Sequence, residues 1–73
     1  MKVLVVDNSI EIRTLLQDIL SSRNYNVGLA ESGEVALQKY VTFKPDVVTL
    51  DLGMPRGMSG YDTLSKIKEI ERG

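Results

Sequence analysis

Three short apolar runs alternate along the chain with three segments in which apolar residues recur every three or four positions. The runs cover residues 2–6, 27–30 and 46–50. The first and third are rich in Val and apolar on both faces, which is typical of strands buried inside a parallel sheet. Gly28 interrupts the second run and weakens its strand signal.

The segments that follow the runs have the spacing of amphipathic helices. The first is expected to be capped by Asn8, with an acidic residue three positions later, and to end near residue 23. The second is expected to open at Ser32 and to close before Pro45, and the third to follow a Ser59–Asp62 capping pattern. Strands that alternate with helices in this way predict right-handed crossovers and a parallel sheet covered on both faces.

The composition limits the size of the domain, its partners and the chemistry that its side chains can carry out. A chain of 73 residues forms at most one small domain. Its formal charge is -1 and its basic residues are scattered, so no nucleic-acid partner is expected. The chain has no Cys and no His, which excludes thiolate nucleophiles and a histidine general base, so any site chemistry must use oxygen. The longest unbroken apolar stretch covers residues 3–6, so no membrane partner is expected and a cytoplasmic location is the default.

Two aspartates stand at equivalent places in the pattern, because Asp7 directly follows the first strand and Asp51 the third. In an open parallel sheet the ligand site lies beyond the carboxyl ends of the strands. Carboxylates on neighbouring strands would lie roughly 5 Å apart, and a cation between them would relieve their repulsion. Oxygen-only ligation favours Mg²⁺, and a carboxylate so placed can accept a phosphoryl group. The alternative is that each Asp only forms a turn or caps a helix.

A family resemblance adds to this interpretation. The stretches Val5-Val6-Asp7-Asn8-Ser9, residues 44–52 and Met54-Pro55 through Gly60 resemble the receiver domain of two-component response regulators, most specifically at Asp51-Leu52-Gly53-Met54-Pro55. The resemblance implies a flavodoxin-like, three-layer α/β/α fold whose parallel sheet has the strand order 2-1-3 in these three βα repeats. It also implies that the domain is not an enzyme but a phosphorelay module.

In that family a sensor histidine kinase or phosphotransfer protein is the phosphoryl donor, and the resemblance makes Asp51 the acceptor. It implies that Mg²⁺ is held by Asp7, by Asp51 and by the backbone carbonyl of Gly53. Asn8 stands where the family usually has a second acid, so it is expected to bind the metal weakly or through water. The loop between Met54 and Gly60 is one residue longer than the usual pattern.

The family has five βα repeats, and this chain ends after the third, so residues 1–73 are expected to form a partial receiver domain with impaired phosphorylation. The third strand would then be an apolar sheet edge, and we expect self-association through it. The alternative function is a structural or self-assembling half-domain that is not phosphorylated.

Overall fold

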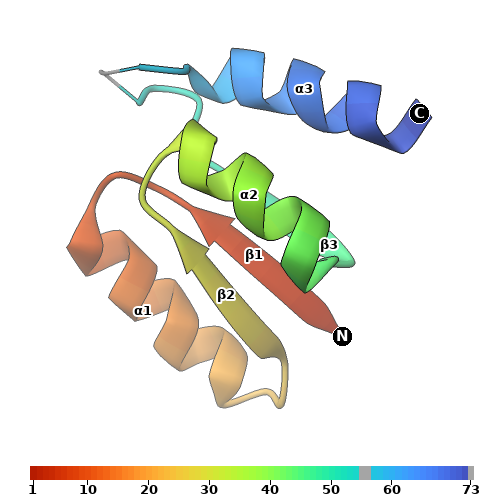
Figure 1. The fold of residues 1–73 in the computed structure, drawn as a ribbon. Coiled ribbons are helices and arrows are strands. Elements are labelled where there is room, and N and C mark those ends of the chain that lie inside the picture. Colours follow the sequence, from red (N-terminus) through yellow and green to blue (C-terminus); the bar gives the residue numbers. More distant parts are fainter. Residues whose placement is uncertain (55–56, 73) are drawn as a thin grey trace.

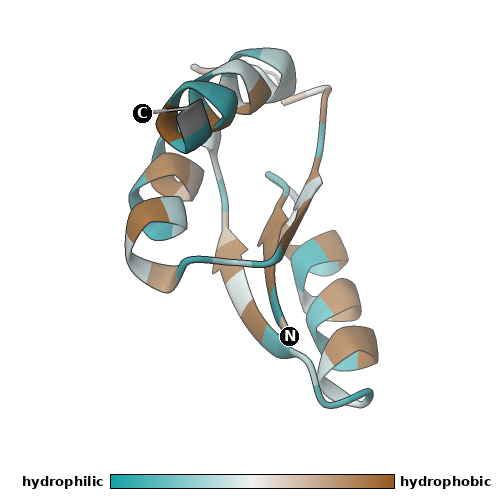
Figure 2. Ribbon diagram, turned by 90° about the vertical axis from the view of Figure 1, so that its right-hand side faces the viewer, coloured by the Kyte–Doolittle hydropathy of each residue, from teal (hydrophilic) through white to brown (hydrophobic). Residues whose placement is uncertain are grey.

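The computed structural model describes residues 1–54 and 57–72, so Pro55 of the family motif and Arg56 in the longer loop lie outside it. In chain order the elements are β1 (Lys2–Val6), α1 (Ile10–Ser21), β2 (Asn26–Ala30), α2 (Gly33–Phe43), β3 (Val47–Leu50) and α3 (Gly60–Arg72) (Figure 1). The strands form a parallel sheet in the order β2-β1-β3, as predicted. Figure 2 shows α1 on one face of the sheet and α2 on the other, which gives the three layers.

The core lies between the sheet and α2. Its buried cluster is Leu4, Val6, Ala30, Ala36 and Met54. Side chains alternate along a strand, so Val3 and Val5 point to the opposite face, toward α1, and they are buried there. The apolar run on both faces of β1 therefore reflects a central strand that is covered from both sides.

The cap of α1 differs from the prediction. Ser9, not Asn8, is the N-cap, and its hydroxyl accepts a hydrogen bond from the backbone N–H of Ile12 at 3.4 Å. The same hydroxyl donates to Glu11 Oε2 at 3.0 Å. The pKa of the Glu11 carboxyl is lowered from its ordinary value, mainly by a hydrogen bond from the backbone N–H of Glu11 and secondly by this bond from Ser9. The helix ends at Ser21, slightly earlier than expected, and the chain turns through Asn24 at φ 66°.

The bounds of the third strand also shift by one residue. β3 begins at Val47, and the preceding Asp46 pairs with Lys2 in two ways. The backbone N–H of Asp46 donates to Lys2 O at 2.8 Å, and its carboxylate accepts from Lys2 N at 2.8 Å. These bonds place β3 beside β1, and the register between the two strands ends with Val6 opposite Leu50.

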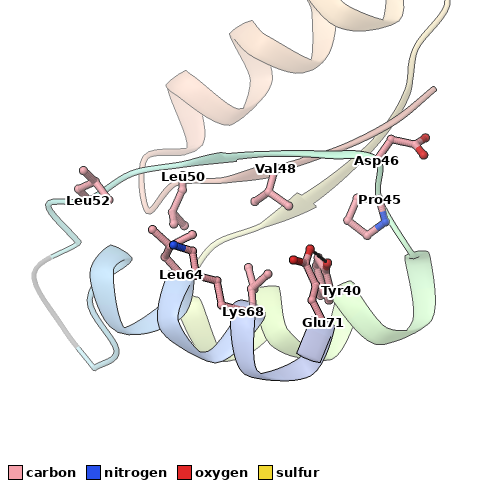
Figure 3. Close-up of a pocket in the computed structure, with 10 residues that line it drawn as sticks. Tyr40, Pro45, Asp46, Val48, Leu50, Leu52, Leu64, Lys68 and Glu71 are labelled. Atoms are coloured by element: carbon pink, nitrogen blue, oxygen red, sulfur yellow. Dashed lines mark hydrogen bonds between the residues drawn. The ribbon is translucent and has the colours of Figure 1, made fainter. Parts of the chain in front are cut away.

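β3 is an end strand of the sheet, and a groove of about 400 Å³ runs beside it (Figure 3). In the close-up Val48 and Leu50 of β3 point toward Leu64 and Lys68 of α3. At the far end, Tyr40 Oη donates to Glu71 Oε1 at 2.5 Å and so ties α2 to α3. Within the described residues no helix is long and apolar enough to cross a membrane.

Candidate functional site

The sheet places Asp7 and Asp51 side by side at its carboxyl edge. Val6 and Leu50 are register partners, and each aspartate is the next residue along its strand. The backbone N–H of Asp51 donates to Val6 O at 3.0 Å, and that of Asp7 donates to Ala30 O at 3.1 Å. Neighbouring strands lie about 4.8 Å apart, so the backbones of the two residues lie side by side, the arrangement expected if β1 and β3 are neighbours.

Each of the two carboxylates also forms a local turn. Asp7 Oδ1 accepts from the backbone N–H of Ser9, and Asp51 Oδ1 accepts from that of Gly53, both at 2.9 Å. The turn-forming role is therefore real, but it uses only one oxygen of each carboxylate. In the described part of the chain no hydrogen-bond donor contacts Oδ2 of either residue, so one oxygen on each remains available to a ligand.

The donor set around this pair suits a hard cation. The described residues contain no cluster of three or more His, Cys, Asp or Glu side chains that could hold a metal. Two carboxylates match Mg²⁺, which is usually held by one or two carboxylates and keeps several waters, and the neighbouring residues Asn8 and Gly53 carry neutral oxygens. Zinc sites use nitrogen and sulfur ligands, and neither His nor Cys occurs in the sequence. The residues present therefore fit Mg²⁺.

Two residues that the sequence did not point to contact the backbone of the site, Arg13 at Asp7 and Gly60 at Asp51. Arg13 Nη1 donates to the carbonyl oxygen of Asp7 at 2.7 Å. Gly60, the first residue of α3, packs so closely against Asp51 and Leu52 that a Cβ at this position would lie 2.5 Å from Leu52 Cα. Neither contact has a signal in the sequence, because both depend on how the loops fold back onto the sheet edge.

Comparison with known proteins identifies the family. The response regulator receiver domain matches residues 3–73. Chemotaxis protein CheY of Thermotoga maritima is 41% identical over 71 residues, which cover 96% of this chain and 58% of that protein. A protein-glutamate methylesterase/protein-glutamine glutaminase of Methanospirillum hungatei is 47% identical over 73 residues, or 97% of this chain and 21% of that protein. The chain thus spans a little over half the length of the first relative and about a fifth of the second.

Solved structures of response regulators are also similar to this chain. Vibrio cholerae CheY4 superposes with a TM-score of 0.91 at 34% identity, over 97% of this chain and 58% of that one. The response regulator TrrA of Thermotoga maritima, in complex with Mg²⁺ and BeF, gives 0.89 at 38% identity, over 97% of this chain and 61% of that one. TrrA in complex with the histidine kinase ThkA gives 0.84 at 40% identity, over 93% of this chain and 58% of that one. The chain belongs to the response regulator receiver domain family of two-component signalling.

Proposed function

We propose that this chain accepts a phosphoryl group on Asp51 from a sensor histidine kinase, with Mg²⁺ bound at Asp7, Asp51 and the carbonyl of Gly53. The observation that carries the proposal is the pair of aspartates at matched register on the carboxyl edge of the sheet, each with one oxygen free of protein donors in the described residues. One relative supports it, because TrrA has been solved in complex with Mg²⁺ and BeF and also in complex with the histidine kinase ThkA.

In the proposed step, Asp51 Oδ2 attacks the phosphorus of the donor's phosphohistidine. A new P–O bond forms, the P–N bond breaks, and its electron pair returns to the leaving imidazole. The turn bond from Gly53 holds Oδ1 and so fixes the plane of the carboxylate, which aims Oδ2. Bound Mg²⁺ would neutralise the negative charge that develops on the transferred group. In this scheme the chain serves as the phosphoacceptor and does not turn over an external substrate.

Asn8 is the fourth residue of the proposed metal site. A side-chain amide offers a neutral oxygen, so it contributes less to Mg²⁺ binding than a carboxylate, either directly or through a water. We propose that metal binding is weaker here than in a receiver domain with two acids after its first strand. Phosphorylation that depends on the metal would be impaired accordingly.

The test is intact mass spectrometry after incubation with Mg²⁺ and acetyl phosphate, a small acyl phosphate that replaces the kinase. We expect a phosphoryl adduct on the wild-type chain and none on Asp51→Asn. Asp46→Asn is the matched control, because this aspartate flanks the other end of β3, and it should keep the adduct. A wild-type chain that shows no adduct at any Mg²⁺ concentration, or an adduct that persists in Asp51→Asn, would contradict the proposal.

We further propose that residues 1–73 act as a partial receiver domain that self-associates through β3. Within the described residues β3 pairs only with β1, so its outer edge offers unpaired backbone groups. Beside this edge Val47, Leu52 and Leu64 are 42%, 45% and 39% exposed. A two-fold axis would pair β3 with its copy antiparallel and give a six-stranded sheet.

Sedimentation at micromolar concentration tests this second proposal. We expect a dimer for the wild-type chain and a monomer for Val47→Lys, because a charge at the exposed start of β3 opposes pairing there. A monomeric wild-type chain would refute it. A chain that dimerises but takes no phosphoryl group would favour the alternative function, a structural half-domain.

A further inference from the structure

The side chain of Arg13 reaches from α1 to the backbone of the proposed metal site. Its backbone N–H donates to Ser9 O at 3.0 Å, so the residue belongs to the first turn of hydrogen bonds in α1. Its guanidinium turns back, and Nη1 donates to Asp7 O at 2.7 Å across six positions of the chain in a part-buried setting. A bond of this length from a charged donor is among the stronger hydrogen bonds in proteins.

The acceptor of this bond is unusual in its position. Asp7 follows the last residue of β1, so its carbonyl lies beyond the register that pairs Val6 with Ala30 and Leu50. A backbone carbonyl that is not paired within the sheet needs a partner from a side chain, other backbone or water, and the guanidinium of Arg13 is that partner here.

The fixed carbonyl matters because a peptide group is planar. The oxygen of Asp7 defines the plane that joins the Cα atoms of Asp7 and Asn8, so holding that oxygen limits how both residues can turn. Asp7 is also held at its N–H by Ala30 O and at Oδ1 by the N–H of Ser9. With its carbonyl bound as well, the residue is held at three atoms, while no donor among residues 1–54 and 57–72 bonds its Oδ2.

We infer that Arg13 is a positioning residue for the cation end of the site. It orients the carboxylate of Asp7 and the amide of Asn8 through the peptide group that they share. The inference rests on the proposed function and deepens it. Because Asn8 brings no charge, a correct arrangement of the remaining oxygens carries more of the metal affinity here.

A purely electrostatic role would have the opposite effect. A guanidinium cation close to a Mg²⁺ site repels the metal, so if charge dominated, removing Arg13 would tighten binding. If Arg13 acts by positioning, removing it loosens the ligands and weakens binding. The sign of the change therefore separates the two roles.

Lys39 provides a matched control. It lines the same cavity of about 300 Å³ as Arg13, together with Leu29, Glu31 and Val35. Its Nζ donates to the carbonyl of Leu29 in β2, so it resembles Arg13 in charge, in length and in bonding a backbone oxygen. Among the described residues it forms no hydrogen bond to Asp7, so removing it takes away a nearby charge without breaking the bond that holds Asp7 O.

The experiment compares Arg13→Met and Lys39→Met, which keep most of each aliphatic stem and remove the donor. Mg²⁺ affinity is measured by calorimetric titration, and amide hydrogen exchange at Asn8 and Ser9 is measured in the metal-free protein. We expect Arg13→Met to weaken Mg²⁺ binding about 10-fold, the lower end of the range for residues that orient metal ligands. Exchange at the two amides should become faster. Lys39→Met should stay within about 2-fold of wild type in affinity, well below the loss expected for Arg13.

Unchanged or tighter Mg²⁺ binding in Arg13→Met would overturn the inference, as would an equal loss in both variants. If Arg13→Met does not fold, Arg13→Gln is used instead, because its side chain is neutral and two bonds shorter than that of Arg. Equal or slower exchange at Asn8 and Ser9 than in wild type would overturn the inference, and faster exchange would support it. A wild-type chain that binds no Mg²⁺ would count against the proposed function, whereas the exchange comparison in the metal-free protein would still decide the role of Arg13.

Discussion

Gly60 offers a sharp test of how the loop after β3 supports Asp51. It is the first residue of α3 and is buried. A Cβ built on it would lie 2.5 Å from Leu52 Cα and 3.0 Å from the carbonyl carbon of Asp51. These are backbone atoms, which cannot rotate away as the end of a side chain can. In Gly60→Ala the segment after β3 would have to move by about 1 Å to restore an ordinary contact of 3.4 Å.

This displacement would affect both stability and chemistry. Added atoms in a close-packed site cost about 1 to 3 kcal/mol. A chain of this size has a total stability on the order of 4 to 11 kcal/mol, so the variant should still fold. The displaced residue is the proposed phosphoacceptor, and a misplacement of about 1 Å can cost about 100-fold in rate. We therefore expect a moderate loss of stability with a much larger loss in the rate of phosphorylation.

Urea denaturation measures the first quantity, and the rate of adduct formation with acetyl phosphate measures the second. Gly28→Ala serves as the control, because its Cβ would meet only side chains, with Phe43 Cε2 at 3.1 Å, in the middle of β2 away from the site. It should lower stability while the phosphorylation rate of the folded protein stays near that of wild type. If Gly60→Ala is phosphorylated at the wild-type rate, the close packing of Gly60 against Asp51 does not position the acceptor.

Two further outcomes follow from the contacts described. Asn8→Asp should tighten Mg²⁺ binding, because it adds a carboxylate beside Asp7, and a metal titration that shows no tightening would refute the role given to Asn8. Tyr40→Phe removes the bond to Glu71 and should lower stability by about 0.5 to 1 kcal/mol in urea denaturation. The hydrogen bond to Glu71 is the main cause, and desolvation the second, of a raised pKa at Tyr40. The stabilisation that the bond gives the folded protein should therefore be fully present below the ordinary tyrosine pKa of about 10 and should disappear as the pH rises through the raised value. Wild type and Tyr40→Phe should therefore converge in stability at high pH, and a difference that persists there would contradict this assignment.

The local pattern of the chain was enough to predict the layered α/β architecture. β1 reads as apolar on both faces because a central strand is covered from both sides, and Asp7 and Asp51 follow their strands at equivalent places. Parallel strands end at one edge, so the pattern places both aspartates at the same edge of the sheet, and they become neighbours because β1 and β3 are adjacent. The strand order 2-1-3 came from the family resemblance and agrees with the structure.

Helix periodicity was less informative about burial. Ile12, Leu15 and Ile19 have the amphipathic spacing on which the first helix was predicted, yet they are 41%, 53% and 45% exposed. A stripe shows which face of a helix is apolar, whereas the amount of that face that is covered depends on which elements pack against it.

The tertiary structure decided the details that set the geometry of the site. Asn8 and Ser9 are both good capping residues, and Ser9 became the cap because its N–H bond to Asp7 Oδ1 shapes the turn out of β1. Arg13 reaches Asp7, and Gly60 supports Asp51, only because α1 and the loop before α3 fold back over the edge of the sheet. Such contacts join a side chain or a missing Cβ to backbone in a separate loop, and no periodicity in the sequence records them. The sequence alone therefore determined which residues could carry the chemistry, and the packing of loops onto the sheet edge determined how they are held.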